Sequence, residues 1–204
     1  MTPQRNVAGI LLAAGQSTRM PGAPKLLLPL GGRPLLRWAA EALVEGGLAP
    51  VVAVAGVDAD GVVRALKGLP ARGIQNPRCA EGVGTSIAAG IRALQADEVN
   101  AVAIALGDMP LLSATTVRSL AAAFLTGEGS IVVPLRRGRR GHPVLFDLAR
   151  HRTALLALRG DQGARAILAD LAAETVGIPV DDDGVLVDVD GPEDYRAVRE
   201  RFNG

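Results

Sequence analysis

The chain has 204 residues and a formal net charge of +1, with 49% hydrophobic and only 2% aromatic residues. This balanced charge argues against binding of nucleic acid or a membrane surface. Cys79 is the only cysteine, which excludes an internal disulfide and a cysteine-based zinc cluster. No apolar run is long enough to cross a bilayer and no secretory start is visible, so we expect a cytoplasmic protein. One domain over residues 1–204 is the default at this length.

Apolar, strand-like runs alternate with segments of helical spacing through most of the chain. The predicted strands are Val7–Leu12, Val51–Ala55, Ala101–Leu106 and Ser130–Val133. The predicted helices are Leu35–Glu45, Gly61–Leu66, Ser86–Gln95 and Thr115–Leu125, the last of them capped by Ser113. This alternation predicts an α/β fold with a mainly parallel central sheet and helices on both faces. In such sheets, ligands bind beyond the carboxyl ends of the strands.

The second half of the chain is less regular. Arg136–Arg140 is a basic turn between two strand-like segments, which suggests a hairpin or a strand pair over Ile131–Leu135 and Pro143–Phe146. We expect Asp161 to cap a helix that runs to Leu171, and Pro192 to open a final helix. Two short strands are predicted between these helices, at Thr175–Ile178 and Val185–Val189.

The loop that follows the first predicted strand is the most informative segment. Ala13, Ala14 and Gly15 let backbone N–H groups approach a ligand closely, and Arg19 and Lys25 supply positive charge for phosphates. The loop lacks the string of a P-loop and the three spaced glycines of a dinucleotide-binding motif. It fits a nucleoside triphosphate site, or an ordinary glycine-containing connection with incidental charges.

Acidic side chains from two distant segments are candidates for a magnesium site. Asp108 follows the predicted strand Ala101–Leu106, where a carboxylate can hold a hard cation beside phosphates or can cap the following turn. Asp188 and Asp190 lie on the same face of a predicted strand, with Asp190 at its end, and either could be the second ligand of Mg²⁺. Asp190 also suits the N-terminus of the final helix electrostatically, and both roles can hold at once.

Several further segments allow a functional and a structural interpretation. Gly82–Ser86 could contact a base or a ribose, or could be an ordinary helix start. The arginines of Arg136–Arg140 could form an anion site, although a solvated hairpin tip explains most of them. His142 follows this turn, and a lone histidine is more often structural than catalytic. The run Asp181–Gly184 lacks the spacing of a calcium loop and is interpreted as an acidic turn.

Six motifs, in order along nearly the whole chain, resemble those of the molybdenum-cofactor nucleotidyltransferase family. The sequence is similar in particular to the cytidylyltransferase branch of that family. The motifs are Leu12–Gly15 with Arg19 and Lys25, Gly82–Ser86, Leu106–Pro110, Gly141–Phe146, Gly160–Arg165 and Asp188–Asp194.

This resemblance implies a Rossmann-like nucleotidyltransferase fold and transfer of CMP from CTP to a molybdopterin-type cofactor, with Mg²⁺ as cofactor and pyrophosphate as product. The catalytic residues would be Arg19, Lys25 and Asp108, and the metal would be held by Asp108 and Asp190. The nucleotide would be contacted by Leu12, Ala13, Ala14, Gly15, Arg19, Lys25, Gly82, Ser86 and Asp108. The acceptor side would include His142 and Asp161.

We expect residues 1–112 to bind mainly the nucleotide and residues 113–204 to bind mainly the acceptor. A transient contact with a molybdoenzyme or its maturation chaperone would follow from the implied function. Ala14 stands where guanylyl-transferring relatives usually have glycine, and its methyl group would crowd a purine more than a pyrimidine. Such crowding is worth about 1–3 kcal/mol and favours CTP over GTP.

Two alternatives stay open at this point. One is a cytidylyl- or sugar-phosphate nucleotidyltransferase of the same fold with another phosphate acceptor. The other is a non-catalytic nucleotide-binding module that delivers a cofactor. The combination of Arg19, Lys25, Asp108 and Asp190 disfavours the second alternative, because binding alone does not need two metal carboxylates.

Overall fold

The computed structural model describes residues 6–15, 24–95, 97–161 and 174–203. Strand β1 (Val7–Ala13) lies inside the main sheet, between two parallel neighbours, β4 (Val51–Ala55) and β6 (Ala101–Leu106). Nearly every residue of these three strands is buried. Strands that are covered on both faces need apolar side chains at every position, which explains their uninterrupted apolar runs.

The main sheet has the strand order β10-β7-β9-β6-β1-β4-β5, with β8 paired to β7. Strand β9 is antiparallel to both of its neighbours, whereas the other pairs along this path are parallel. The prediction of a mainly parallel sheet is therefore confirmed, and the sheet takes strands from both halves of the chain. Its remaining strands are β5 (Ala71–Gln75), β7 (Ile131–Arg136), β8 (Arg139–Arg140), β9 (Val144–Asp147) and β10 (Thr175–Pro179).

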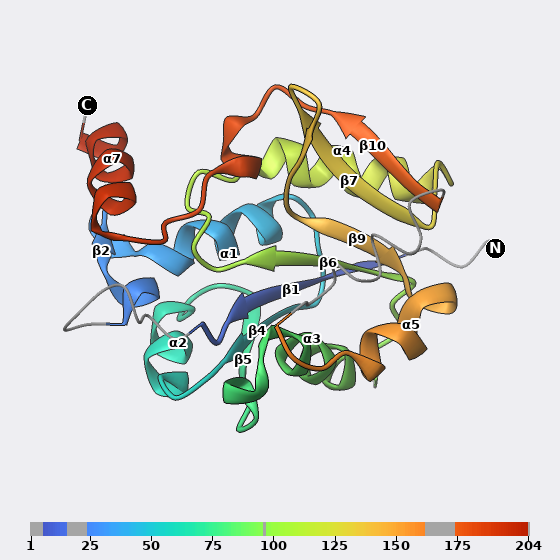
Figure 1. Cartoon of the computed structure of the whole chain (residues 1–204), viewed down its shortest axis with the longest axis horizontal. Coiled ribbons are helices and arrows are strands. Elements are labelled where there is room, and N and C mark those ends of the chain that lie inside the picture. The colour runs from blue at the N-terminus through green and yellow to red at the C-terminus, as the bar shows by residue number, and fades with distance from the viewer. Residues whose placement is uncertain (1–5, 16–23, 96, 162–173, 204) are drawn as a thin grey trace.

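Helices cover both faces of this sheet, as predicted (Figure 1). One face carries α1 (Leu35–Glu45), α2 (Ala59–Ala65) and α4 (Ala114–Leu125), and the other carries α3 (Val83–Ala93) and α5 (Leu148–Ala157). Successive side chains of β1 serve the two faces, since Leu11 belongs to the core under α1 and α4 and Ile10 to the core under α3 and α5. In the described part of the chain, no helix combines the length and apolar character that a bilayer crossing requires.

One predicted strand is wrong. Val185–Val189 does not join the sheet, and Asp183–Leu186 instead forms a short 3₁₀ helix, η4. The Asp182 carboxylate explains this difference, because it accepts a hydrogen bond from the Gly184 backbone N–H (2.8 Å) and another from the Thr116 hydroxyl (2.7 Å). Such local bonding from side chain to backbone competes with strand pairing.

Several elements were not predicted, β5 and α5 among them, and two expectations cannot be compared. Strand β5 alternates apolar and polar residues too weakly to be recognised, and α5 contains a histidine and two arginines in place of a clear apolar stripe. Asp161, the expected helix cap, is described, but the helix expected to follow it up to Leu171 lies outside the described residues, as does Arg19.

The final helix, α7 (Pro192–Asn203), begins at Pro192 as predicted and returns to the N-terminal part of the chain (Figure 1). It packs beside a small antiparallel pair, β2 (Pro29–Leu30) and β3 (Arg33–Pro34). The Tyr195 hydroxyl donates to the Pro29 carbonyl, and the ring of Phe202 lies 4.6 Å from the ring of Trp38 on α1. These contacts hold the segment before α7 close to the segment before β2.

We expect Phe202→Ala to lower the free energy of unfolding by about 1–3 kcal/mol, because it removes a partly buried aromatic contact. Urea denaturation followed by circular dichroism measures the change. Phe202→Leu, which keeps most of the apolar volume, should lose less. Equal stability of Phe202→Ala and the unmodified protein would show that α7 is not held by this ring pair.

Candidate active site

Lys25 and Asp108 form an ion pair at the carboxyl ends of the central strands, although they are 83 positions apart in the chain. Lys25 opens the short 3₁₀ helix η1 (Lys25–Leu27), and Asp108 follows β6. The Lys25 Nζ atom lies 2.8 Å from Oδ2 of Asp108, and the two side chains are 13% and 19% exposed. Water and salt screen such a pair less than an ion pair on the open surface.

A third segment reaches the same place from the end of the chain. The Val189 backbone N–H donates to the Asp108 carbonyl (2.9 Å), and Oδ1 of Asp190 lies 3.5 Å from the Lys25 Nζ atom. The Asp194 carboxylate accepts from the backbone N–H groups of Asp190 (3.0 Å) and Gly191 (2.8 Å). Asp194 therefore shapes the turn that presents Asp190.

Among the described residues, carboxylates outnumber basic side chains around Lys25. The pKa of Asp188 is raised above its ordinary value, first by partial desolvation and then by the nearby Asp108 carboxylate, with a further contribution from Asp190. Asp188 is solvent-exposed, so water weakens the shift of its pKa. Three carboxylates thus share the surroundings of one lysine, and a cation would relieve their repulsion.

One oxygen of this cluster is suited to bind a cation. Oδ1 of Asp108 is buried, and it has no hydrogen-bond partner among the described residues. A buried carboxylate oxygen without a partner is costly unless a donor or a cation satisfies it. Within the described ranges, no group of three or more His, Cys, Asp or Glu side chains could hold a metal by itself. The residues therefore fit Mg²⁺, which proteins commonly hold with one or two carboxylates plus substrate phosphates.

A hollow of about 320 Å³ lies between the end of β1 and the start of α3. The hydroxyl of Ser86 faces this hollow and accepts a hydrogen bond from the buried Asn76 side chain (3.0 Å), so its own hydrogen stays available to donate. Asn76 directly follows the unpredicted strand β5 and was not predicted as a site residue. The lining residues are Leu12, Ala14, Gly15, Cys79, Ala80, Gly82, Val83, Ser86 and Asp161.

Close packing explains the glycine at position 82 without reference to a ligand. Gly82 has φ +106°, and a Cβ atom there would lie 2.2 Å from the carbonyl carbon of Gly160. The Gly84 backbone N–H also donates to the Gly160 carbonyl (2.9 Å). These contacts bring Asp161 to the start of α3, where it lines the hollow.

A larger cleft of about 570 Å³ shares Leu12, Val83 and Asp161 with the first hollow. Its wall is mainly apolar and comes from α3, β6, β7, β9 and η4. Polar side chains that line it include Arg139, Arg140, His142, Asp161 and Asp188. Both residues predicted for the acceptor side, His142 and Asp161, thus line this cleft.

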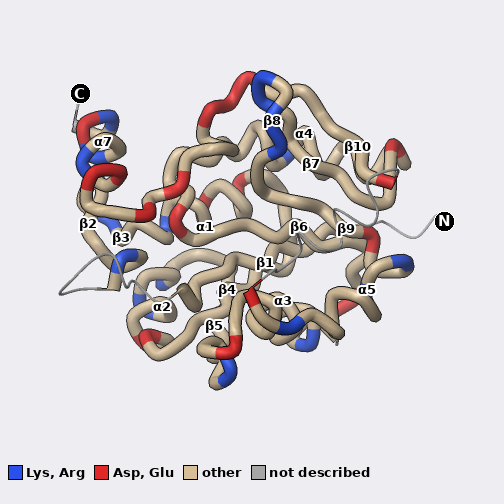
Figure 2. Tube along the Cα trace, viewed as in Figure 1, with Lys and Arg blue, Asp and Glu red and all other residues tan. Residues whose placement is uncertain are grey.

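The basic hairpin at the edge of this cleft lies beside the acidic turn (Figure 2). Arg136 pairs with Asp181 and Asp183, the latter at 2.6 Å, and Arg137 lies 3.9 Å from Asp183. The predicted solvated hairpin tip is therefore tethered in part by ion pairs.

The structure gathers most of the predicted site residues into adjoining places. Lys25, Asp108 and Asp190 lie together, and Leu12, Ala14, Gly15, Gly82 and Ser86 line the smaller hollow. Ala13 is an exception, because it is 6% exposed, belongs to the core and lines neither hollow.

Residues 9–176 match the family model of the MobA-like NTP transferase domain. The chain belongs to the MobA-like NTP transferase family. Among curated relatives, nicotine blue oxidoreductase of Paenarthrobacter nicotinovorans is 38% identical over 79% of this chain and 81% of its own length. The bifunctional protein GlmU of Kineococcus radiotolerans is 41% identical over 65% of this chain, but the match spans only 28% of that protein.

Solved structures show the same fold. Rv0371c of Mycobacterium tuberculosis superposes with a TM-score of 0.83 at 24% identity, covering 96% of this chain and 98% of that one. Its complex with manganese gives a TM-score of 0.79 at 23% identity, with coverage of 96% and 98%. Molybdopterin-guanine dinucleotide biosynthesis protein A of Archaeoglobus fulgidus gives 0.68 at 19% identity, again covering 96% and 98%. This MobA-like chain therefore has the nucleotidyltransferase fold.

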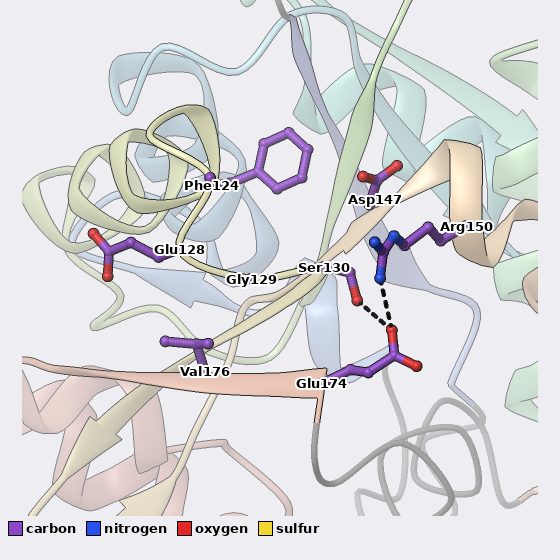
Figure 3. Close-up of a pocket in the computed structure, with 9 residues that line it drawn as sticks. Phe124, Glu128, Gly129, Ser130, Asp147, Arg150, Glu174 and Val176 are labelled. Atoms are coloured by element: carbon purple, nitrogen blue, oxygen red, sulfur yellow. Dashed lines mark hydrogen bonds and ion pairs between the residues drawn. The ribbon is translucent and has the colours of Figure 1, made fainter.

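A further hollow, of about 330 Å³, lies at the opposite edge of the sheet, where β7 and β10 begin (Figure 3). Its polar side chains bond to one another. The Ser130 hydroxyl donates to Glu174 (2.9 Å), Arg150 lies 3.3 Å from the same carboxylate, and the buried ring of His151 is 3.0 Å from the Ser130 oxygen. This network stabilises the sheet edge and stands apart from the candidate site.

We expect acid pH to destabilise the protein through His151. Its pKa is lowered, first by burial and then by Arg150, while Glu174 and Asp147 oppose the shift in part. Below about pH 6.5 the unfolded chain therefore takes up a proton that the folded chain resists, so stability falls until the folded pKa is passed.

Urea denaturation at about pH 7.5 and about pH 5.5 measures this effect, with His151→Gln as the non-titrating comparison. The unmodified protein should lose more stability between the two pH values than the variant does. Equal losses would contradict the assignment to His151.

Proposed function

We propose that the protein transfers CMP from CTP to a molybdopterin-type cofactor and releases pyrophosphate. The main support for nucleotidyl transfer is the convergence of Lys25, Asp108 and Asp190 at the carboxyl ends of the central strands. A lysine among excess carboxylates suits a metal-bound triphosphate, because both charges are then compensated.

The acceptor phosphate attacks the α-phosphorus of CTP, and pyrophosphate leaves. A phosphate oxygen is already anionic near neutral pH, so the chain does not need to supply a general base. Its residues align the reactants and neutralise charge. Lys25 stabilises negative charge on the α-phosphate, and Arg19 assists the departing pyrophosphate.

Asp108 and Asp190 are the proposed ligands of Mg²⁺, with Asp188 as the alternative to Asp190. The buried Oδ1 atom of Asp108 and the surplus of carboxylates support this assignment. The manganese complex of Rv0371c shows that a protein of this fold can be crystallised with a divalent cation. When bound, the metal supplies positive charge to the phosphates.

The smaller hollow is the proposed nucleotide site. Its loop would contact CTP through Leu12, Ala13, Ala14 and Gly15, together with Gly82. The Ser86 hydroxyl, fixed by Asn76, can donate to an acceptor on the cytosine ring. The methyl group of Ala14 lies in the same lining and would disfavour a purine.

The larger cleft is the proposed acceptor site, with His142 and Asp161 in its lining. The molybdopterin-type acceptor is supported by the MobA-like family match and by the motifs of the second half. We place the reaction in the cytoplasm, with a transient contact to a molybdoenzyme or its chaperone that takes over the product.

An oxidoreductase activity on an organic molecule is a second candidate, favoured by the 38% identity to nicotine blue oxidoreductase. Two assays separate the candidates. One measures pyrophosphate release from CTP in the presence of molybdopterin, and the other follows nicotine blue absorbance with NADH or NADPH. Turnover in the second assay alone would contradict the proposed nucleotidyl transfer.

Lys25→Ala and Asp108→Asn should each lower kcat for pyrophosphate release by about 100- to 1,000-fold, the usual cost of removing one electrostatic contact to a transition state. Lys67→Ala, which removes an exposed lysine of α2's C-terminal flank, is the matched control and should stay fully active. Near-normal turnover of Lys25→Ala or Asp108→Asn, with the fold verified by circular dichroism, would refute the assigned roles.

Ala14→Gly should relax the preference for CTP over GTP, because it removes the methyl group that crowds a purine. A steric difference of about 1–3 kcal/mol corresponds to a shift of roughly 10- to 200-fold in the ratio of kcat/KM values. Pyrophosphate release with each nucleotide gives this ratio. An unchanged ratio would count against the steric explanation.

A further inference from the structure

The arginines of the basic hairpin fall into two groups. Arg136 and Arg137 form ion pairs with Asp181 and Asp183 of the acidic turn. Arg139 and Arg140 form β8, and their backbones pair with Leu135 and Arg136 of β7. Within the described part of the chain, neither Arg139 nor Arg140 has an ion pair or a side-chain hydrogen bond. The acidic turn thus balances the charge of Arg136 and Arg137 but not that of Arg139 and Arg140.

Arg139 and Arg140 both line the larger cleft, and they are the only lysine or arginine residues among its described lining residues. Most of the remaining wall is aliphatic. The apolar side chains include Val83 and Ile87 of α3, Ile104 and Leu106 of β6, Val133 of β7 and Val144 of β9. An apolar wall bordered by two exposed arginines suits a ligand with an apolar body and an anionic group.

The hairpin is held in place by contacts that do not involve the side chains of Arg139 and Arg140. A Cβ atom on Gly141 would lie 2.3 Å from the Val185 carbonyl oxygen, and the His142 backbone N–H donates to that oxygen (3.0 Å). Asp182 anchors the same 3₁₀ helix to Thr116 of α4 (2.7 Å). The backbone that carries the two arginines is therefore fixed before any ligand arrives, which reduces the entropy lost on binding.

We propose that Arg139 and Arg140 determine acceptor specificity by binding an anionic group of a ring compound whose ring covers the apolar wall. This inference rests on the proposed function, in which the larger cleft is the acceptor side. A phosphate monoester on a ring system is the simplest ligand of this class. Guanidinium groups bind phosphate through paired, charge-assisted hydrogen bonds, which an uncharged ring compound cannot replace.

Flavin mononucleotide and riboflavin are suitable probes, because they share one planar ring system and differ in the phosphate. Fluorescence titration of the full chain is carried out with Mg²⁺ and saturating α,β-methylene CTP, which occupies the nucleotide site. The phosphorylated probe should bind at least about tenfold more tightly than riboflavin, as expected for hydrogen bonds to a charged group.

The double variant Arg139→Ala/Arg140→Ala should bind both probes alike, and Arg137→Ala, from the same hairpin, should keep the difference. Arg139→Lys/Arg140→Lys should retain part of it, because the charge is kept while the paired geometry is lost. Equal binding of the two probes by the unmodified protein would overturn the inference. A preference for the phosphate that survives in the double alanine variant would overturn it as well.

A kinetic measurement separates this inference from the proposed function. With CTP and molybdopterin, the double alanine variant should raise KM for molybdopterin by about 10- to 100-fold and leave KM for CTP unchanged. If the unmodified protein releases no pyrophosphate with molybdopterin, but phosphate discrimination between the flavin probes depends on the arginines, the proposed function fails, whereas the assignment of the two arginines as the site for an anionic group stands. If KM for CTP rises instead, the arginines serve the nucleotide and the inference fails.

Discussion

The ion pair between Lys25 and Asp108 is the interaction on which the arrangement of the candidate site depends. It joins the segment after β1 to the end of β6, two strands that lie side by side and run in the same direction. The backbone bond from Val189 to Asp108 then brings Asp190 to the pair, and α7 holds that segment against β2 through Tyr195. Three distant parts of the chain therefore meet at one point because the sheet brings the first two together and the final helix carries the third.

Charge balance explains why this meeting point suits a metal-bound nucleotide. Among the described residues, three carboxylates lie around one lysine, and an oxygen of Asp108 is buried with no hydrogen-bond partner there. The basic hairpin carries positive charge beside the larger cleft, since Arg136 and Arg137 pair with the acidic turn while Arg139 and Arg140 line the cleft.

The sequence predicts those parts of the molecule in which one local pattern decides the structure. Strands β1, β4 and β6 are buried on both faces, so their apolar runs are unambiguous, and parallel strands place Lys25 and Asp108 at a common edge. The prediction failed where competing local bonds decide the structure, as at Val185–Val189, where Asp182 favours a 3₁₀ helix. Asn76 was missed because its role depends on a contact with Ser86 across a turn, which no spacing reveals. The difference between the two arginine groups depends likewise on which of them meets the acidic turn.

Electron paramagnetic resonance of Mn²⁺ tests the central claim most directly, because it counts bound metal without requiring turnover. The account predicts that Mn²⁺ binds to the protein tightly only together with CTP, and that Asp108→Asn loses this CTP-dependent binding while keeping its fold. Mn²⁺ binding that is the same with and without CTP, or that is unaffected by Asp108→Asn, would contradict a shared metal–triphosphate site at Lys25 and Asp108.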